Sequence, residues 1–96
     1  MLHGHIDIPT ISFWEFGNIW TGSVYQTFNY RIAKKTEGER TELWCVIWYG
    51  LKCFELLTPE EYDCELHEEV TSEGLERTVD FINGKVDEYR KKLSNA

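Results

Sequence analysis

The stretch TELWCVIWY, from Thr41 to Tyr49, is apolar on both of the faces that an extended chain presents. Successive side chains of a β-strand point to opposite sides of the sheet, so alternate residues share a face. One face carries Trp44, Val46 and Trp48, and the other carries the residues between them. A strand with one solvated face would alternate apolar and polar side chains instead. The pattern therefore predicts a central strand that is covered on both sides.

A second strand is predicted immediately before this stretch. Residues 27–35 place Phe28, Tyr30 and Ile32 on one face and polar side chains on the other, which is the period of a half-solvated strand. The polar residues 36–40 contain a glycine and predict a hairpin loop between the two strands. Strands joined by so short a loop are antiparallel.

Further strands are expected on both sides of this hairpin. Residues 52–57 predict a third short strand, which Pro59 ends because proline has no backbone N–H to donate. Another edge strand is expected near residues 62–66. Near the N-terminus, residues 11–16 and 18–21 fit either a strand or an extended aromatic arm, and we expect one N-terminal strand to join the sheet.

The most regular element is an amphipathic helix. Its apolar residues recur at alternating spacings of four and three, which places them on one face of a helix from about residue 73 to residue 93. Thr71 or Ser72 can cap its start, and acidic residues in the first turn and basic residues in the last match the helix dipole. Gly84 lies off the apolar stripe, where it either allows a close neighbour or is merely tolerated. The stripe consists of Leu75, Val79, Ile82, Val86, Tyr89 and Leu93.

These elements predict an α+β fold, namely a three- or four-stranded antiparallel sheet with one C-terminal amphipathic helix packed on one face. The chain has 96 residues, which is enough for one hydrophobic core and too few for two. We therefore expect a single domain over residues 1–96, with residues 1–10 forming a flexible N-terminal arm. Aromatic residues make up 15% of the chain, so we expect an ordered core without a metal or a disulfide.

The negative charge of the chain is concentrated in one segment. Residues 53–76 contain nine acidic residues and no lysine or arginine, whereas the rest of the chain has a small positive excess. The formal charge of −7 therefore arises from one quarter of the sequence. Such a field repels nucleic acid and anionic membranes, and it attracts basic surfaces over about 8 Å, the Debye length at physiological salt.

This acidic segment suggests a binding site for a basic protein surface. Its carboxylates can take the place of the phosphates of a nucleic-acid strand, and affinity should then fall steeply with salt because counterions are released. The alternative is an acidic loop that only keeps the protein in solution and protects a sheet edge. Tyr62 is the expected anchor at the centre of the site. The expected partner-binding residues are Glu60, Glu61, Tyr62, Asp63, Glu65, Glu68 and Glu69.

The chain also has more large aromatic side chains than one face of a small sheet can readily cover. Tryptophan and tyrosine are favoured at protein interfaces, so the second face of the central strand is a candidate surface for a homodimer or another partner. Alternatively, the N-terminal arm folds across that face and completes the core. The expected aromatic interface consists of Trp14, Trp20, Trp44, Trp48 and Tyr49.

No motif in the sequence indicates a catalytic, cofactor or metal site. The three cysteines are an odd number with no C-x-x-C spacing, which argues against a disulfide framework and a zinc knuckle. Cys64 and His67 lie close in sequence, but no second cysteine or histidine pair stands at a ligand spacing. We accordingly expect no cofactor and no metal. Neither a signal peptide nor a run of about 20 apolar residues is present, so we expect a cytoplasmic protein that does not enter a membrane.

In size, acidity and lack of a catalytic motif, the chain resembles the small single-domain proteins with which phages and conjugative elements block host nucleases, anti-CRISPR and anti-restriction proteins among them. The resemblance implies a nuclease or a CRISPR effector as partner. Our leading hypothesis is a non-enzymatic module that inhibits such an enzyme by mimicking DNA or RNA, since the charge disfavours direct binding of nucleic acid. The alternatives are a homo-oligomeric structural or accessory protein joined through its aromatic sheet face, and a small-ligand or catalytic domain with a pocket between sheet and helix.

Overall fold

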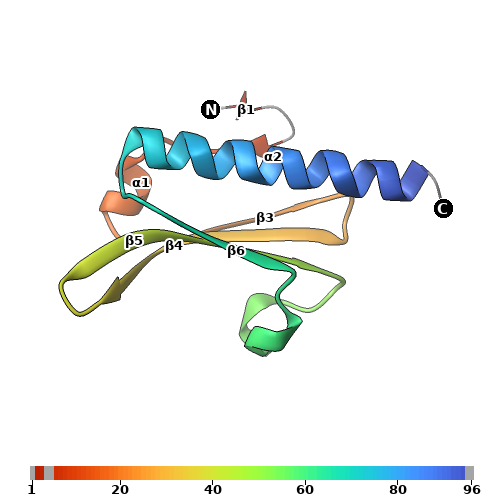
Figure 1. Ribbon diagram of the computed structural model, residues 1–96, viewed down its shortest axis with the longest axis horizontal. Coiled ribbons are helices and arrows are strands. Elements are labelled where there is room, and N and C mark those ends of the chain that lie inside the picture. Colours follow the sequence, from red (N-terminus) through yellow and green to blue (C-terminus); the bar gives the residue numbers. More distant parts are fainter. Residues whose placement is uncertain (1, 4–5, 95–96) are drawn as a thin grey trace.

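The computed structural model describes residues 2–3 and 6–94 and shows a four-stranded antiparallel sheet with a long helix across one face (Figure 1). The strand order is β3-β4-β5-β6, so strands that follow one another in the chain are neighbours in the sheet. The α+β class, the antiparallel sheet and the helix packed on it are thereby confirmed. These elements are β3 (Trp20–Val24), β4 (Phe28–Glu37), β5 (Arg40–Tyr49), β6 (Cys64–Glu68) and α2 (Ser72–Ser94).

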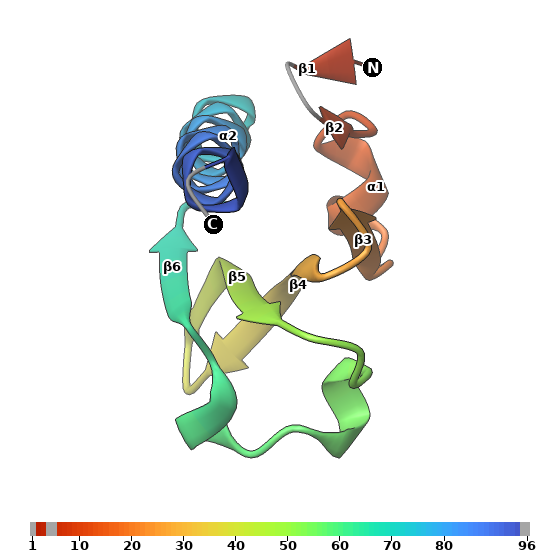
Figure 2. The ribbon, with the colours of Figure 1, turned by 90° about the vertical axis from the view of Figure 1, so that its right-hand side faces the viewer.

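The central strand β5 is covered on both faces, as its apolar pattern predicts. Leu43, Cys45 and Ile47 are buried in the core beneath α2, and this side of the sheet is called the helix face. Val46 and Trp48 are buried on the opposite side, called the outer face. The sheet therefore needs two covers, and Figure 2 shows one on each side of it.

The β4–β5 hairpin sets the register of the sheet. Its two strands of ten residues pair along their whole length, and Ile32 lies opposite Cys45, so the apolar side chains of both strands share the helix face. The turn needs a residue in the left-handed region, and Gly38, with φ of +62°, supplies it. The predicted hairpin loop is thus a tight turn between Glu37 and Arg40.

The helix α2 provides the first cover. It begins one residue before and ends one residue after the predicted range, and Thr71 caps it, since Thr71 Oγ1 accepts a hydrogen bond of 3.0 Å from the backbone N–H of Gly74. Tyr89 of the predicted stripe is partly buried, as is Phe81 outside it, whereas Leu93, the last predicted member, is exposed. The fully buried members of that stripe are Leu75, Val79, Ile82 and Val86.

The N-terminal segment lies beside α2 and completes the cover of the helix face (Figure 2). Ile6 and Ile8, from the arm expected over residues 1–10, are buried in the same core as Trp14. Residues 1, 4 and 5 lie outside the described part. The elements of this segment are β1 (Leu2–His3), β2 (Ile6–Asp7) and α1 (Ser12–Glu15).

Residues 11–16 form a short helical turn, and neither the strand nor the extended arm expected for them is found. The backbone N–H groups of Phe13 and Trp14 donate to carbonyls three residues earlier, which closes the turn. The turn presents the Trp14 ring to the core, and Trp14 Nε1 donates a hydrogen bond of 2.9 Å to the carbonyl of Ile32. The N-terminal strand that joins the sheet is β3.

Residues 50–63, called the covering segment, lie across the outer face and form the second cover (Figure 2). The strand predicted for residues 52–57 is wrong, because this stretch contains the 3-10 helical turn η1 (Phe54–Leu56), followed by η2 (Pro59–Glu61). Trp48 explains the change of direction, since Trp48 Nε1 donates a hydrogen bond of 2.8 Å to the carbonyl of Lys52. The chain then returns to the sheet as β6, close to the predicted edge strand.

Two glycines of α2 predict opposite responses to the same substitution. A Cβ at Gly84 would meet no atom within 4 Å, so Gly84→Ala should raise the free energy of unfolding by about 0.8–1 kcal/mol through helix propensity. A Cβ at Gly74 would lie 2.1 Å from the carbonyl oxygen of Glu69, so Gly74→Ala should lower it by about 1–3 kcal/mol. Urea unfolding of both variants tests this. A destabilised Gly84→Ala would show that the glycine serves a close neighbour after all.

Candidate functional site

The acidic residues predicted to bind a partner lie on and around β6, which forms one edge of the sheet. Alternation along β6 divides them between the two faces. Glu65 lies on the outer face, opposite Val46, whereas Glu68 lies on the helix face, opposite Leu43. The run of charge in the sequence is therefore not one continuous surface, and each carboxylate has its own surroundings.

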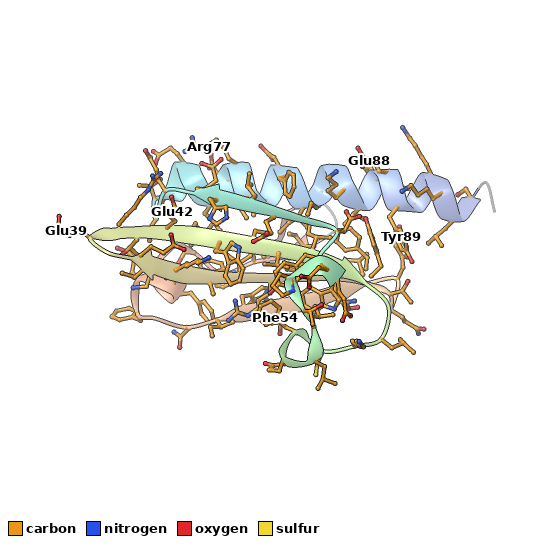
Figure 3. All side chains as sticks on the ribbon, turned by 60° about the horizontal axis from the view of Figure 1, so that its bottom comes forward. Glu39, Glu42, Phe54, Arg77, Glu88 and Tyr89 are labelled. Carbon is orange, nitrogen blue, oxygen red and sulfur yellow. The ribbon has the colours of Figure 1, made fainter. Side chains whose placement is uncertain are left out.

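Glu68 and Glu69 meet an arginine of α2. Arg77 Nε lies 2.9 Å from Glu68 Oε1, and Arg77 Nη2 lies 3.9 Å from Glu69 Oε2. The hydrogen bond to Glu68 raises the pKa of Arg77 above its usual value. Figure 3 shows Arg77 on α2. Glu68 is thus largely neutralised within the molecule, while the Glu69 side chain stays exposed.

Glu61 is also paired within the molecule. Its carboxylate lies 3.0 Å from Lys52 Nζ and accepts a further hydrogen bond from Thr58, and the bond to Lys52 lowers the pKa of Glu61. The neighbouring Glu60 is exposed on η2. The Lys52–Glu61 pair joins the two halves of the covering segment.

Tyr62, the expected anchor for a partner, is half-buried and packs on other rings of the chain. Its ring is stacked on Phe54, with centroids 5.7 Å apart and planes inclined by 16°, and it also meets the edge of Trp44. The charge of Asp63, which follows, contributes to the raised pKa of Tyr49. The backbone N–H of Asp63 donates to the carbonyl of Ile47 at 2.8 Å, which brings the chain back to β5.

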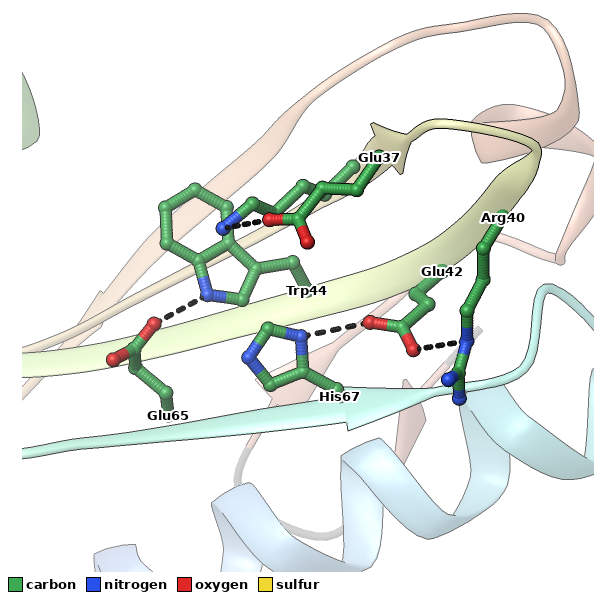
Figure 4. A network of polar contacts seen from close by, with 7 residues as sticks. Glu37, Arg40, Glu42, Trp44, Glu65 and His67 are labelled. Carbon is green, nitrogen blue, oxygen red and sulfur yellow. Dashed lines mark hydrogen bonds and ion pairs between the residues drawn. The ribbon is translucent and has the colours of Figure 1, made fainter.

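A polar network lies on the outer face beside this edge (Figure 4). Trp44 Nε1 donates a hydrogen bond of 2.7 Å to Glu65 Oε1, and His67 Nδ1 lies 2.9 Å from Glu42 Oε2. Arg40 Nε lies 2.7 Å from the other oxygen of Glu42. Glu42 and Arg40 were not among the predicted site residues, because only the register of β5 and β6 brings them next to His67.

A cluster of rings and cations holds the covering segment on the outer face. The guanidinium carbon of Arg31 lies 4.2 Å from the ring centroid of Phe54 and 5.7 Å from that of Trp44, and Lys35 Nζ lies 4.7 Å from Trp44. These are cation–π distances. Burial lowers the pKa of Arg31, and its Nη1 atom has no hydrogen-bond partner within the described residues. The phenyl ring of Phe54, which also packs on Trp48, is thus the centre of this contact.

The five aromatic residues predicted to form an interface do not share a surface. Trp14 and Trp48 are buried, Trp20 and Trp44 are half-buried, and Tyr49 lies on the helix face, where it stacks on Tyr89 in α2. The chain itself covers the outer face, but it does so with the covering segment. The N-terminal arm, which was the alternative considered as a cover for this face, lies on the helix face.

The described residues contain no group of three or more histidine, cysteine or acidic side chains placed to hold a metal ion. Cys64 belongs to the core of the helix face, and His67 lies on the outer face, so the two do not converge. A groove of about 410 Å³ lies on the outer face between β3 and the covering segment, with Trp48, Leu51 and Phe54 among its lining residues. No helix within residues 2–3 and 6–94 has both the length and the apolar character needed to cross a membrane.

Comparisons of the chain with protein-family models, with curated proteins and with solved structures give no match. The geometry nevertheless separates the predicted acidic residues into two groups. Glu61 and Glu68 form short ion pairs within the molecule. The other four carboxylates form no ion pair as short as these two within the described residues. We call this group the acidic edge, and it consists of Glu60, Asp63, Glu65 and Glu69.

Two apolar residues of the covering segment, Phe54 and Leu56, should differ in how much they contribute to the free energy of unfolding. Phe54→Ala removes the ring that contacts Arg31 and Trp48, so we expect it to lower the free energy of unfolding by about 2–3 kcal/mol and to shift tryptophan fluorescence toward longer wavelength. Leu56→Ala, at an exposed position in the same turn, should change stability by less than about 0.5 kcal/mol. Similar losses in the two variants would contradict this role of Phe54.

Tyr49 predicts a loss of stability at high pH. Burial, followed by the charge of Asp63, raises the pKa of Tyr49 from 10.0 to about 12. Between these values the folded chain keeps a proton that the unfolded chain has lost, so this contribution to stability is complete below pH 10.0 and is lost as the pH rises toward about 12. Tyr49→Phe should therefore make stability fall less steeply in this range. Urea unfolding at several pH values, together with tyrosinate absorbance, measures both effects. If all tyrosines of the wild type titrate near the ordinary tyrosine pKa, this prediction for Tyr49 is wrong.

Proposed function

We propose that the chain is a non-enzymatic protein-binding module that binds a basic surface through its acidic edge. The observation that supports this most directly is the group of four carboxylates, on β6 and the residues beside it, that remain after the internal ion pairs of Glu61 and Glu68 are formed. These carboxylates do not form one continuous surface, but like charges near one exposed edge repel each other, and a cationic surface that approaches this edge lowers their electrostatic free energy.

The position of the acidic edge suits a narrow basic cleft. Strand β6 has five residues and so extends over about 17 Å, and it lies at the rim of the sheet, where a partner can approach it from the side. Enzymes that act on nucleic acids hold their substrate by lysine and arginine contacts to phosphates. In its most specific form, the proposal is that the protein inhibits a nuclease, such as a CRISPR effector or a restriction enzyme, by occupying its DNA or RNA channel.

The structure changes which of the predicted residues we expect to contact a partner directly. Glu61, Tyr62 and Glu68 have internal partners, so in this proposal they position the edge and contribute less to the contact itself. The direct contacts fall to the four residues of the acidic edge. The hydrogen bond that Trp44 donates to Glu65 fixes the position of this carboxylate on the outer face.

Charge reversal at matched positions tests the proposal. Glu60→Lys with Glu69→Lys changes two exposed residues of the acidic edge, and Glu15→Lys with Glu39→Lys makes the same change in net charge at exposed sites on α1 and on the β4–β5 turn. Figure 3 shows Glu39 at the tip of the hairpin. We expect the first variant to lose affinity about fivefold or more for each close charge pair, and the second to bind as the wild type does.

The measurement uses purified nucleases, including a CRISPR effector and a restriction enzyme, with cleavage of DNA as one readout and binding at low and high salt as the other. Thermal unfolding of both variants controls for stability. Equal weakening in the two variants would mean that net charge alone is responsible, and inhibition that is insensitive to both would remove the acidic edge from the proposal.

A further inference from the structure

The opposite edge of the sheet, formed by β3, has none of the features that protect β6 from pairing with another strand. The sequence of β3, WTGSV from Trp20 to Val24, contains no charge and no proline, and within the described residues β3 pairs only with β4. Charged side chains and prolines are the usual means of blocking an exposed strand edge. β6, in contrast, carries Glu65, His67 and Glu68.

Exposed apolar side chains lie at both ends of β3. Phe16 and Ile19, which precede the strand, are 85% and 54% exposed, and Tyr25, which follows it, is 46% exposed. Leu51, 88% exposed, lies with β3 on the rim of the groove of the outer face. Several large apolar groups thus surround one unprotected strand, which is the arrangement expected of an interaction surface.

The backbone of β3 is accessible because the residues in the middle of the strand, Thr21, Gly22 and Ser23, are small. On the helix face the Tyr30 ring packs over Gly22 and occupies the place where a Cβ would stand, only 2.4 Å from the ring. On the outer face Thr21 and Ser23 are short and exposed. Trp20 and Val24 lie on the helix face and pack against the core, so a strand that approaches from the side meets only short side chains on the outer face of β3.

We propose that β3 pairs with β3 of a second copy of the chain, in antiparallel orientation, to form a continuous eight-stranded sheet. Two identical strands that pair in this way are related by a two-fold axis, so each copy offers the same surface. The pairing brings the Phe16 and Ile19 end of one copy toward the Tyr25 end of the other. The apolar groups at the two ends of β3 therefore cover one another, which identifies a second copy as the occupant.

The charge distribution also favours a second copy. Two chains of charge −7 repel each other when their acidic segments meet, but the order β3-β4-β5-β6 places β6 on the order of 14 Å from β3, more than a Debye length at physiological salt. In the proposed dimer the two acidic edges lie at the outer rims of the sheet. This assembly uses a surface separate from the acidic edge and does not depend on the proposed function.

Substitution of a single serine tests the dimer. Ser23→Lys places a charge on the unprotected edge, and Ser94→Lys makes the same change at an exposed position in the last turn of α2. We expect the wild type and Ser94→Lys to form a dimer as the concentration rises, and Ser23→Lys to raise the dissociation constant at least tenfold. The melting temperature at low concentration, where all three proteins are monomers, should be unchanged. Sedimentation equilibrium measures association, and hydrogen exchange should show protection of the β3 amides that increases with concentration.

The outcomes separate the possible occupants of this edge. A wild type that stays monomeric at about 1 mM overturns the proposal, and binding of an extended apolar peptide to that monomer would assign the edge to another protein. If Ser23→Lys does not weaken the dimer, or if dimerisation protects amides outside β3, the interface lies elsewhere and the proposed β3–β3 pairing is wrong. Weakening by Ser94→Lys to the same extent would show that added charge, and not the β3 edge, is responsible.

Discussion

The need to cover β5 on both of its faces shapes the whole molecule. A strand with Leu43, Cys45 and Ile47 on one side and Val46 and Trp48 on the other cannot keep either side in water without a large hydrophobic cost. One helix covers one face of a small sheet. The other face is covered by the chain between β5 and β6, which therefore cannot serve as a further strand.

The second cover differs in chemistry from the first. The helix face is an aliphatic and aromatic core, whereas the outer face combines rings with cations, and Arg31 lies between Phe54 and Trp44. A guanidinium group is weakly hydrated and planar, so it packs on aromatic rings at lower cost than an ammonium group does. Because the covering segment ends beside β5, it leads the acidic residues directly onto the edge of the sheet.

Much of this fold could be predicted from the sequence, because period-two and period-3.6 patterns arise from backbone geometry. β4, β5, their hairpin and α2 all carry such patterns, and they were found where they were expected. Residues 52–57 were misassigned because alternating apolar residues fit a strand and also fit a segment that packs its rings on a sheet face. The short turn of α1 has no period of its own, and its position depends on the hydrogen bond from Trp14 to β4.

The candidate site was less predictable than the fold. The sequence shows how many acidic residues are present, but pairing with Lys52 or Arg77 depends on contacts between elements that are far apart in the chain. Tyr62 looked like a surface anchor because its neighbours are charged, yet its ring faces Phe54. The contact between Glu42 and His67 requires the register of β5 and β6, which no local pattern supplies.

The order of the elements along the chain has a consequence during synthesis. The four strands precede α2 in the chain, so the apolar helix face, with Phe28, Ile32 and Leu43, has no helix over it until α2 has been synthesised. A nascent chain in this state is prone to aggregate. The acidic residues of the covering segment and β6 also precede α2, and repulsion between these charges on neighbouring nascent chains opposes aggregation until the helix docks.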